Sequence, residues 1–183
     1  MRQLTYSDTQ RHYMQEALFE ADQAGLIGEV PIGAVIVHDG QIIGRGHNLR
    51  EHANDATLHA EIRAIEEACA TLRSWRLEDC EMYVTIEPCL MCSGAIINSR
   101  IPVVYYGARD PKAGAVDSLY ETLTDDRLNH QVKVYEGLLA KESGERLVSF
   151  FKAARQRAKA AKKARRAAQK AATDKTLDSP EKS

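Results

Sequence analysis

Apolar and polar positions along the chain follow two alternating periods, which predict helices and strands in turn. A capping box at residues 7–10 precedes apolar side chains at helical spacing, which predicts an N-terminal helix. Residues 30–37 predict a strand, residues 39–40 (Asp-Gly) predict a type I′ turn, and a return strand begins at residue 41. The chain therefore opens with a helix and a β-hairpin.

The alternation continues through the next hundred residues. Residues 47–58 are polar and irregular, which indicates a loop, and a helix follows from His59. Pro88 fits the first turn of another helix, where a missing N–H costs nothing. The remaining predicted elements are a strand at 82–86, the helix from 88 to about 99, strands at 103–106 and 132–135, and a long helix beyond 138. Five strands alternating with helices predict a three-layer α/β/α fold around a central five-stranded mixed sheet.

The composition fits one globular domain and excludes several classes of protein. The 183 residues are 44% hydrophobic and 28% charged, which is ordinary for a folded domain, and they suffice for one full core. The longest apolar runs have only a few residues, so we expect no membrane span. The polar N-terminal residues lack an apolar stretch, so we expect no secretory signal. Four cysteines are too few for a disulfide scaffold, so we expect a reducing, cytoplasmic location.

The net charge of −1 conceals an uneven distribution of charge. Residues 1–145 hold 13 basic and 23 acidic side chains, whereas residues 146–173 hold 10 basic and no acidic ones. A cationic C-terminal arm on an acidic body indicates a polyanionic partner. We expect a domain at residues 1–157 and a basic helical extension at residues 158–183, which ends in a disordered tail from about residue 174.

Two short segments carry the candidate chemistry. One is His59-Ala60-Glu61, where a loop becomes a helix, and the other is Pro-Cys-Leu-Met-Cys at 88–92, where a strand ends and a helix starts. Each alone is a weak signal, because a lone histidine or a lone C-x-x-C is common. Together, His59, Cys89 and Cys92 are the three ligands of a catalytic zinc site with one open position. Helix N-termini also stabilise thiolates.

Glu61 follows two residues after the predicted histidine ligand. That position lets a carboxylate reach a metal-activated water without binding the metal, as a proton shuttle requires. The pattern His-x-Glu…Pro-Cys-x-x-Cys is the known signature of zinc-dependent nucleobase deaminases.

A closed structural zinc site is the alternative interpretation of the same residues, with Cys69 or Cys80 as a fourth ligand. Cys69 lies on the apolar face of its predicted helix, so a buried core thiol explains it better, and Cys80 just before a strand is explained in the same way. A closed site would also leave Glu61 without a role.

Beyond these motifs, the sequence resembles the bacterial tRNA-specific adenosine deaminases, a family with the cytidine deaminase-like fold. The resemblance runs from about residue 8 to about residue 155. The matching segments are EVPIGAV at 29–35, GHN at 46–48, GARDPKAGA at 107–115, LNH at 128–130 and FFKAAR at 150–155. The family often has a proline where Ala56 stands, a difference that concerns the stiffness of the loop rather than catalysis.

The resemblance implies hydrolytic deamination of adenosine to inosine at the wobble position (34) of a tRNA anticodon, typically in an arginine tRNA. It implies one zinc ion per subunit, with Glu61 carrying protons to the ring nitrogen and then to the leaving ammonia. It also implies a homodimer with each active site near the subunit interface, and no further protein partner.

The resemblance also implies a set of substrate contacts. Asn48 and the main chain of Ala60 would bind the flipped nucleoside, and Val30 and Ile86 would line its pocket. The contacts to the anticodon loop would come from Asp110, Lys112, Phe150, Phe151, Lys152 and Arg155. Turn capping for Asn48 and Asp110 and core packing for the apolar side chains are the structural alternatives.

Three other functions fit parts of the pattern. A zinc deaminase of a free base or nucleotide (guanine, cytosine or dCMP) would share the metal residues and Glu61, but it needs neither residues 107–115 nor a basic helix. A non-catalytic zinc and RNA-binding module would leave Glu61 unused. Deamination of adenosine in other RNAs or in single-stranded DNA would use the same chemistry.

The basic segment from about residue 158 to 170 extends past the matched region. We expect it to add attraction to phosphates that is independent of sequence and weakens with salt. A solvated tail without a binding role is the alternative.

Overall fold

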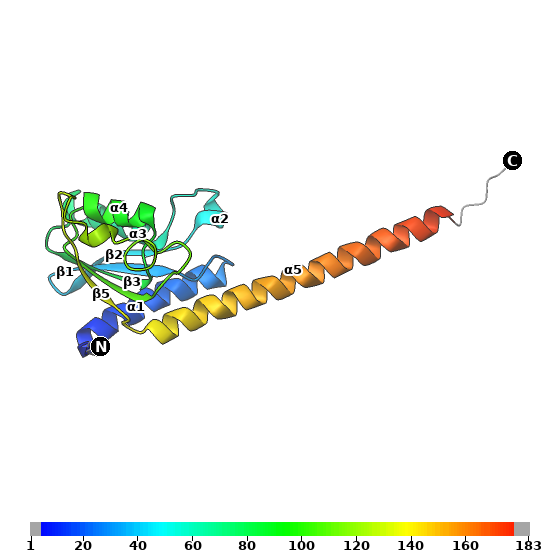
Figure 1. Ribbon diagram of the computed structural model, residues 1–183, viewed down its shortest axis with the longest axis horizontal. Helices are drawn as coiled ribbons and strands as arrows, with labels where there is room; N and C mark the ends of the chain where they lie inside the picture. The colour runs from blue at the N-terminus through cyan, green and yellow to red at the C-terminus, as the bar shows by residue number, and fades with distance from the viewer. Residues whose placement is uncertain (1–4, 178–183) are drawn as a thin grey trace. The chain divides into compact units, whose positions relative to one another are not determined.

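One mixed five-stranded sheet organises the part of the chain that the computed structural model describes, residues 5–177 (Figure 1). Its strand order is β2-β1-β3-β4-β5, with β1 antiparallel to both of its neighbours and β3, β4 and β5 parallel. The strands are β1 (Gly33–His38), β2 (Gln41–His47), β3 (Cys80–Ile86), β4 (Val103–Ala108) and β5 (Lys133–Glu136). The predicted α/β fold with a five-stranded mixed sheet is confirmed.

Helices lie on both faces of this sheet, as the three-layer prediction requires (Figure 1). The helices are α1 (Asp8–Leu26), α2 (Arg50–Ala53), α3 (Ala60–Leu72), α4 (Leu90–Asn98), the 3₁₀ turn η1 (Thr122–Thr124) and α5 (Ala140–Leu177). Successive strand side chains alternate between the faces. Met82 and Val104 therefore pack in the core beneath α3 and α4, whereas Tyr83 and Tyr105 pack with Met14 of α1.

Two glycines of β2 allow α3 to approach the sheet backbone closely. A Cβ atom at Gly46 would lie 2.1 Å from the carbonyl oxygen of Ala60, and one at Gly44 would lie 2.2 Å from that of Ala64. Only hydrogen fits in these spaces, since real Cβ contacts are longer. The first turn of α3, which follows His59, is therefore held directly against the end of β2.

Local capping explains where several elements begin. The predicted capping box is present at α1, where the Ser7 hydroxyl accepts from the Gln10 N–H and the Gln10 side chain accepts from the Ser7 N–H. The hairpin turn is confirmed by positive φ angles at Asp39 (49°) and Gly40 (74°).

Three predicted boundaries differ from the structure. The first strand begins at Gly33, because Pro31 and the turn around it precede regular pairing. The loop at 47–58 contains the short helix α2. Pro88 lies just before the helix rather than in its first turn, since Cys89 is the N-cap residue of α4.

The described chain separates into two units, one up to Leu147 and one from Val148 onward. Helix α5 continues to Leu177, so the first four residues of the segment expected to be disordered are helical, and residues 178–183 lie outside the described residues. The division of the protein at residue 157 stays a prediction. None of the helices in the described part has the length and apolar character needed to cross a bilayer.

We expect Gly46→Ala to destabilise the protein by about 1–3 kcal/mol, because the new methyl group would force α3 away from β2. Gly94→Ala is the matched control: Gly94 lies inside α4 with nothing within 4 Å of its Cβ position, so alanine should be neutral or stabilising by up to about 1 kcal/mol. Thermal or urea unfolding of both variants measures the difference. Equal stability of the two variants would contradict the close approach of α3.

Candidate active site

The predicted ligands come from the start of two helices. His59 is the N-cap residue of α3, Cys89 is the N-cap residue of α4, and Cys92 lies three residues further along α4. N-cap and N3 side chains of one helix face each other, so both thiols lie on the same side of α4. The two helices begin at neighbouring points of the sheet and bring the three side chains together.

The distances between the donor atoms match those of a tetrahedral metal site. The Nδ1 atom of His59 lies 3.6 Å from the Sγ of Cys89 and 3.5 Å from the Sγ of Cys92. Bonds of about 2.3 Å to sulfur and about 2.05 Å to nitrogen give a sulfur–nitrogen edge of about 3.6 Å in a zinc tetrahedron. Among the described residues, these three form a group that could hold a metal ion, and their soft donors suit zinc.

Cys69 and Cys80 do not contribute to this cluster. Cys80 is buried at the start of β3, where burial raises the pKa of its thiol to about 11, and Cys69 packs partly buried against the same core. Both cysteines therefore lie in the core. No fourth protein ligand from them closes the site.

The electrostatics of the two ligand thiols differ. The hydrogen bond with Cys92, followed by the one with His59, lowers the pKa of Cys89 to about 4 against the effect of burial. The same sulfur–sulfur hydrogen bond, together with burial, raises the pKa of Cys92 above its ordinary value. The hydrogen bond to Cys89 raises the pKa of His59. These shifts favour the thiolate form of Cys89 and the protonated form of Cys92, and binding of a cation would displace the remaining proton.

Glu61 lies beside the cluster and is almost fully buried, with 4% of its surface exposed. Burial, with a contribution from the negative charge of Cys89, raises the pKa of Glu61 to about 7. A carboxyl group with that pKa can take up and release a proton near neutral pH.

A backbone hydrogen bond between the residues that follow Asn48 and precede His59 brings these two residues close together. The Leu49 N–H donates to the Leu58 carbonyl over 3.0 Å, and Asn48 and His59 flank that pair on either side. The Asn48 side chain is buried and donates to a carboxylate oxygen of Glu29 over 2.9 Å. The structure therefore brings Asn48, Ala60 and Glu61 to one region around the cluster.

The two predicted pocket-lining residues occupy different environments. Val30 is half-buried in the turn before β1, not within the strand, and its carbonyl accepts from the Ile32 N–H. Ile86 is the last residue of β3 and is 2% exposed. Val30 lies two residues before Ile32, whose carbonyl accepts from the Asn48 N–H, and Ile86 directly precedes Glu87.

The segment at 109–118 is organised around the buried carboxylate of Glu87. One oxygen accepts from the N–H groups of Val116, Asp117 and Ser118 at 2.7–3.1 Å, and the other accepts from the Asp110 N–H at 2.9 Å and from the Ser118 hydroxyl. Burial alone would raise the pKa of Glu87, but these hydrogen bonds hold it below its ordinary value. One side chain thus fixes the whole turn.

Gly114 explains why this segment is rich in small residues. A Cβ atom at Gly114 would lie 2.3 Å from the Glu87 carboxylate, and Gly114 forms an isolated bridge with Cys89. The Asp110 side chain accepts from the N–H groups of Lys112 and Ala113, which is the turn-forming alternative, while Lys112 is exposed. The segment is therefore anchored beside the ligand Cys89.

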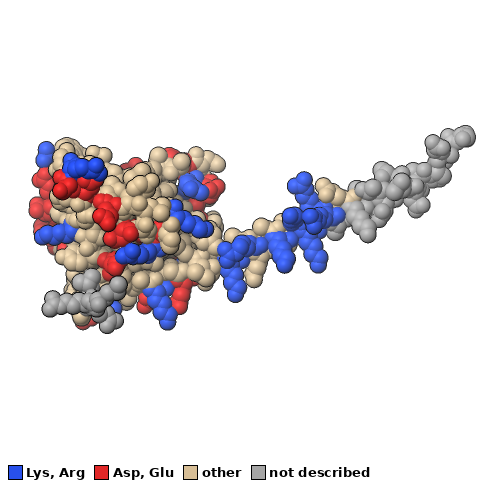
Figure 2. Space-filling model, viewed as in Figure 1, with Lys and Arg blue, Asp and Glu red and all other residues tan. Residues whose placement is uncertain are grey.

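The predicted contacts of the last helix belong to the second unit. Phe150 and Phe151 meet edge to face with ring centroids 5.4 Å apart, and Phe151, Lys152 and Arg155 are exposed. Figure 2 shows Lys and Arg side chains gathered along the helix of the second unit, and residues 146–173 contain no Asp or Glu. The basic residues that make the charge of the sequence uneven thus lie on the surface of a helix.

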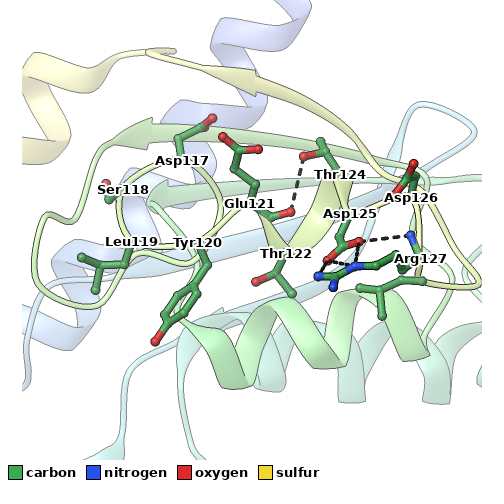
Figure 3. Close-up of a pocket in the computed structure, with 11 residues that line it drawn as sticks. Asp117, Ser118, Leu119, Tyr120, Glu121, Thr122, Thr124, Asp125, Asp126 and Arg127 are labelled. Carbon is green, nitrogen blue, oxygen red and sulfur yellow. Dashed lines mark hydrogen bonds and ion pairs between the residues drawn. The ribbon is translucent and has the colours of Figure 1, made fainter.

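A cavity of about 900 Å³ lies apart from these residues (Figure 3). It is lined by residues 117–128 except Leu123, and none of the metal-cluster residues borders it. The lining includes four acidic side chains, and its one arginine, Arg127, pairs with Asp125. This acidic cavity does not suit phosphate groups, so the candidate chemistry lies at the His59–Cys89–Cys92 cluster.

Fold and site together define a deaminase of the cytidine deaminase-like class, because a His-Cys-Cys cluster with an adjacent buried glutamate is the catalytic arrangement of that class. The MafB19-like deaminase family matches residues 8–155. The chain is also 56% identical over 155 residues to a tRNA-specific adenosine deaminase of Streptococcus pyogenes serotype M1, covering 85% of this chain and 91% of that protein.

Two solved structures resemble the fold. One comes from a study of A-to-I editing by tRNA:A34 deaminases at the wobble position, with 48% identity, a TM-score of 0.72, and coverage of 74% of this chain and 99% of that one. The other is a guanine deaminase from Bacillus subtilis, with 42% identity, a TM-score of 0.52, and coverage of 54% of this chain and 63% of that one. The chain belongs to the tRNA-specific adenosine deaminase family.

Sequence reasoning assigned no role to Glu29 or Glu87. Both side chains are buried, at 1% and 3% exposure. In each, the two carboxylate oxygens accept hydrogen bonds from a segment of the site. The sequence offers one signal for these two residues: each is a single acidic residue in an otherwise apolar stretch. Each also lies near a predicted site residue, since Glu29 directly precedes Val30 and Glu87 lies two residues before Cys89.

We expect Glu87→Gln to loosen residues 109–118, because an amide group would turn N–H donors toward backbone N–H groups. The loss in the free energy of unfolding should be about 2 kcal/mol at neutral pH, and amide hydrogen exchange at residues 116–118 should accelerate.

The anchoring by Glu87 should also depend on pH. Because the pKa of Glu87 is lower in the folded protein, its stabilisation is present above pH about 4.5 and is lost as the pH falls below that value. Ser118→Ala, which removes one hydrogen bond among five, is the milder control. Unchanged exchange in Glu87→Gln would exclude the anchoring role.

Proposed function

We propose that the protein is a zinc-dependent enzyme that converts adenosine to inosine at the wobble position, 34, of a tRNA anticodon, typically that of an arginine tRNA. The observation that carries this proposal is the His59–Cys89–Cys92 cluster with the buried Glu61 beside it. The family relationship supports tRNA as the substrate.

His59, Cys89 and Cys92 would hold one zinc ion per subunit and leave a fourth position open. A bound zinc ion lowers the pKa of a water molecule and so supplies the nucleophile for hydrolysis. The spacing of the three donor atoms supports this assignment.

Glu61 is the proposed proton shuttle. Its carboxylate takes a proton from the attacking water, delivers it to the adenine ring nitrogen, and passes a further proton to the amino group that leaves C6 as ammonia. The reaction consumes one water and one adenosine and yields one inosine and one ammonia. Burial beside the cluster supports this role, because the site excludes bulk water as a competing proton donor.

The substrate contacts follow the family pattern. We assign Asn48 and the main chain of Ala60 to the flipped nucleoside, and Val30 and Ile86 to the walls of its pocket. The anticodon loop would be held by Asp110, Lys112, Phe150, Phe151, Lys152 and Arg155. The exposed Lys112, Lys152 and Arg155 are available to phosphates.

Two of the three alternative functions are less well supported. A free-base deaminase would share the cluster, but it would not need the cationic surface of α5. A non-catalytic zinc and RNA-binding module would not need a buried carboxyl beside the cluster. Release of ammonia from free guanine or cytosine would favour the first, and tight tRNA binding without inosine would favour the second.

We also propose that the protein acts as a homodimer in the cytoplasm, where tRNA is available. Support for an interface near the site comes from the exposed apolar side chains of Leu90 and Met91, directly after Cys89, and of Leu119 and Tyr120. The Leu119 N–H donates to Gly114, the residue that bridges to Cys89, so both groups lie close to the ligand. Exposed apolar side chains grouped near one site favour a protein–protein interface there.

The basic extension from residue 158 to 183 is proposed to strengthen tRNA binding without entering the reaction. Within the described part of this extension, five cationic side chains are exposed: Lys159, Lys162, Lys163, Arg165 and Arg166. Like-charged, solvated side chains attract a polyanion through release of its counterions, and the attraction does not depend on base sequence.

Sequencing of tRNA wobble positions after incubation with the purified protein tests the reaction and the substrate together. We expect inosine at position 34 of one anticodon. Glu61→Ala should lower the rate at least about a thousandfold while keeping one zinc per chain, because the shuttle does not bind the metal. Cys92→Ser is the contrasting variant, which should lose both zinc and activity. Inosine formation that survives in Glu61→Ala would remove the shuttle assignment.

Truncation after Arg157 tests the extension. We expect the dissociation constant for tRNA to rise about tenfold or more at low salt, with a smaller salt dependence and an unchanged kcat. A full-length variant with glutamine at positions 159, 162, 163, 165 and 166 separates the loss of charge from the loss of length. Equal affinity of all three proteins at low salt would show that the extension is a bystander.

A further inference from the structure

Glu29 connects two separate parts of the site from within the core. It lies between α1 and β1, is 1% exposed, and uses its two carboxylate oxygens on different partners. One oxygen accepts from the Asn48 side-chain amide at 2.9 Å, and the other accepts from the His52 backbone N–H at 2.5 Å. Among the described residues, no ion pair involves Glu29. Its carboxylate is therefore held by these two hydrogen bonds.

The hydrogen bond to Asn48 determines which way its amide group is turned. An asparagine amide has a donor side and an acceptor side of almost the same shape, and its surroundings decide between them. A carboxylate oxygen can face only the NH₂ side. The Oδ1 atom of Asn48 is therefore directed away from Glu29, which leaves one acceptor atom and one remaining N–H for a substrate.

The bond to His52 holds the loop that leads to the histidine ligand. His52 lies in α2, and the loop continues from there to Leu58, whose carbonyl accepts from the Leu49 N–H. The side chain of Asp55 braces the same loop by accepting from the N–H and hydroxyl of Thr57. Glu29 thus ties Asn48 to α2, the first part of the segment between Asn48 and His59.

We propose that Glu29 is a positioning residue that orients the Asn48 amide toward the nucleoside and fixes the loop before His59. The inference rests on the proposed function, in which Asn48 binds the substrate base. Glu29 itself does not touch the substrate, because it is enclosed by the protein on all sides. A carboxylate is required here, since only that group accepts hydrogen bonds at both oxygens from two N–H donors.

Glu29→Gln is the direct test, because glutamine has the same shape but turns an NH₂ group toward one of the two donors. We expect kcat/KM for tRNA deamination to fall about tenfold or more, with zinc content unchanged. Glu29→Asp keeps the charge but is one methylene shorter, so it should fold and show a partial loss. It keeps the proposal testable if Glu29→Gln does not fold.

Glu20→Gln is the matched control. Glu20 is another buried carboxylate, at 8% exposure, and it pairs with Arg45 and with His47, which directly precedes Asn48. We expect this variant to lose thermal stability comparably and to keep kcat/KM within about twofold. A loss of activity that simply follows the melting temperature in both variants would overturn the positioning role.

A double-mutant cycle with Asn48→Ala decides whether Glu29 acts through Asn48. If it does, Glu29→Gln should change kcat/KM less than about twofold in the Asn48→Ala background. Independent, multiplying losses would overturn the proposal.

NMR of the Asn48 side-chain NH₂ group gives a readout that does not depend on activity. Its hydrogen exchange should be slow in the native protein and fast in Glu29→Gln, together with the amide of His52. If the native protein formed no inosine, the proposed function would fail while this measurement still tested the positioning of Asn48. Slow exchange that persisted in Glu29→Gln would exclude Glu29 as its anchor.

Discussion

The site depends on the meeting of two helix N-termini at one end of the sheet. His59 caps α3 and Cys89 caps α4, so the ligand atoms are placed where each helix begins rather than along its length. The close approach of α3 to Gly44 and Gly46 sets the depth of His59, and the β3 strand delivers Cys89. Displacement of either helix would separate nitrogen from sulfur, and the 3.5–3.6 Å spacing leaves little freedom for that.

Three buried glutamates lie in the segments around these two helix N-termini, and they differ in their partners and in what they are suited to do. Glu61 lies beside the cluster, with its pKa raised by burial, which suits proton transfer. Glu87 has its pKa held low by donated hydrogen bonds, which suits a fixed anchor for the segment at 109–118. Glu29 binds one side-chain amide and one backbone N–H. The same type of side chain is thus suited to acid–base chemistry or to anchoring a segment, according to the groups around it.

Much of the fold could be predicted because its signals are local. The capping box at Ser7, the Asp39–Gly40 turn and the strand alternation each occupy a few neighbouring residues, and each is confirmed. The errors occur where the deciding contact is distant or irregular. Pro88 was placed inside a helix because proline suits a first turn, whereas Cys89 takes the N-cap position. The sequence does not predict the short helix α2, because three polar residues and one alanine are too few to show a helical period.

The sequence by itself determined the chemistry of this protein, because the His-x-Glu and Cys-x-x-Cys spacings define donor types within single helical turns. It also determined the cationic character of α5, which is a matter of composition. The tertiary structure alone decided that the segments 30 residues apart converge and which donors Glu29 and Glu87 accept hydrogen bonds from. Hydrogen-bond partners depend on contacts between distant segments, which an acidic residue in an apolar stretch does not specify.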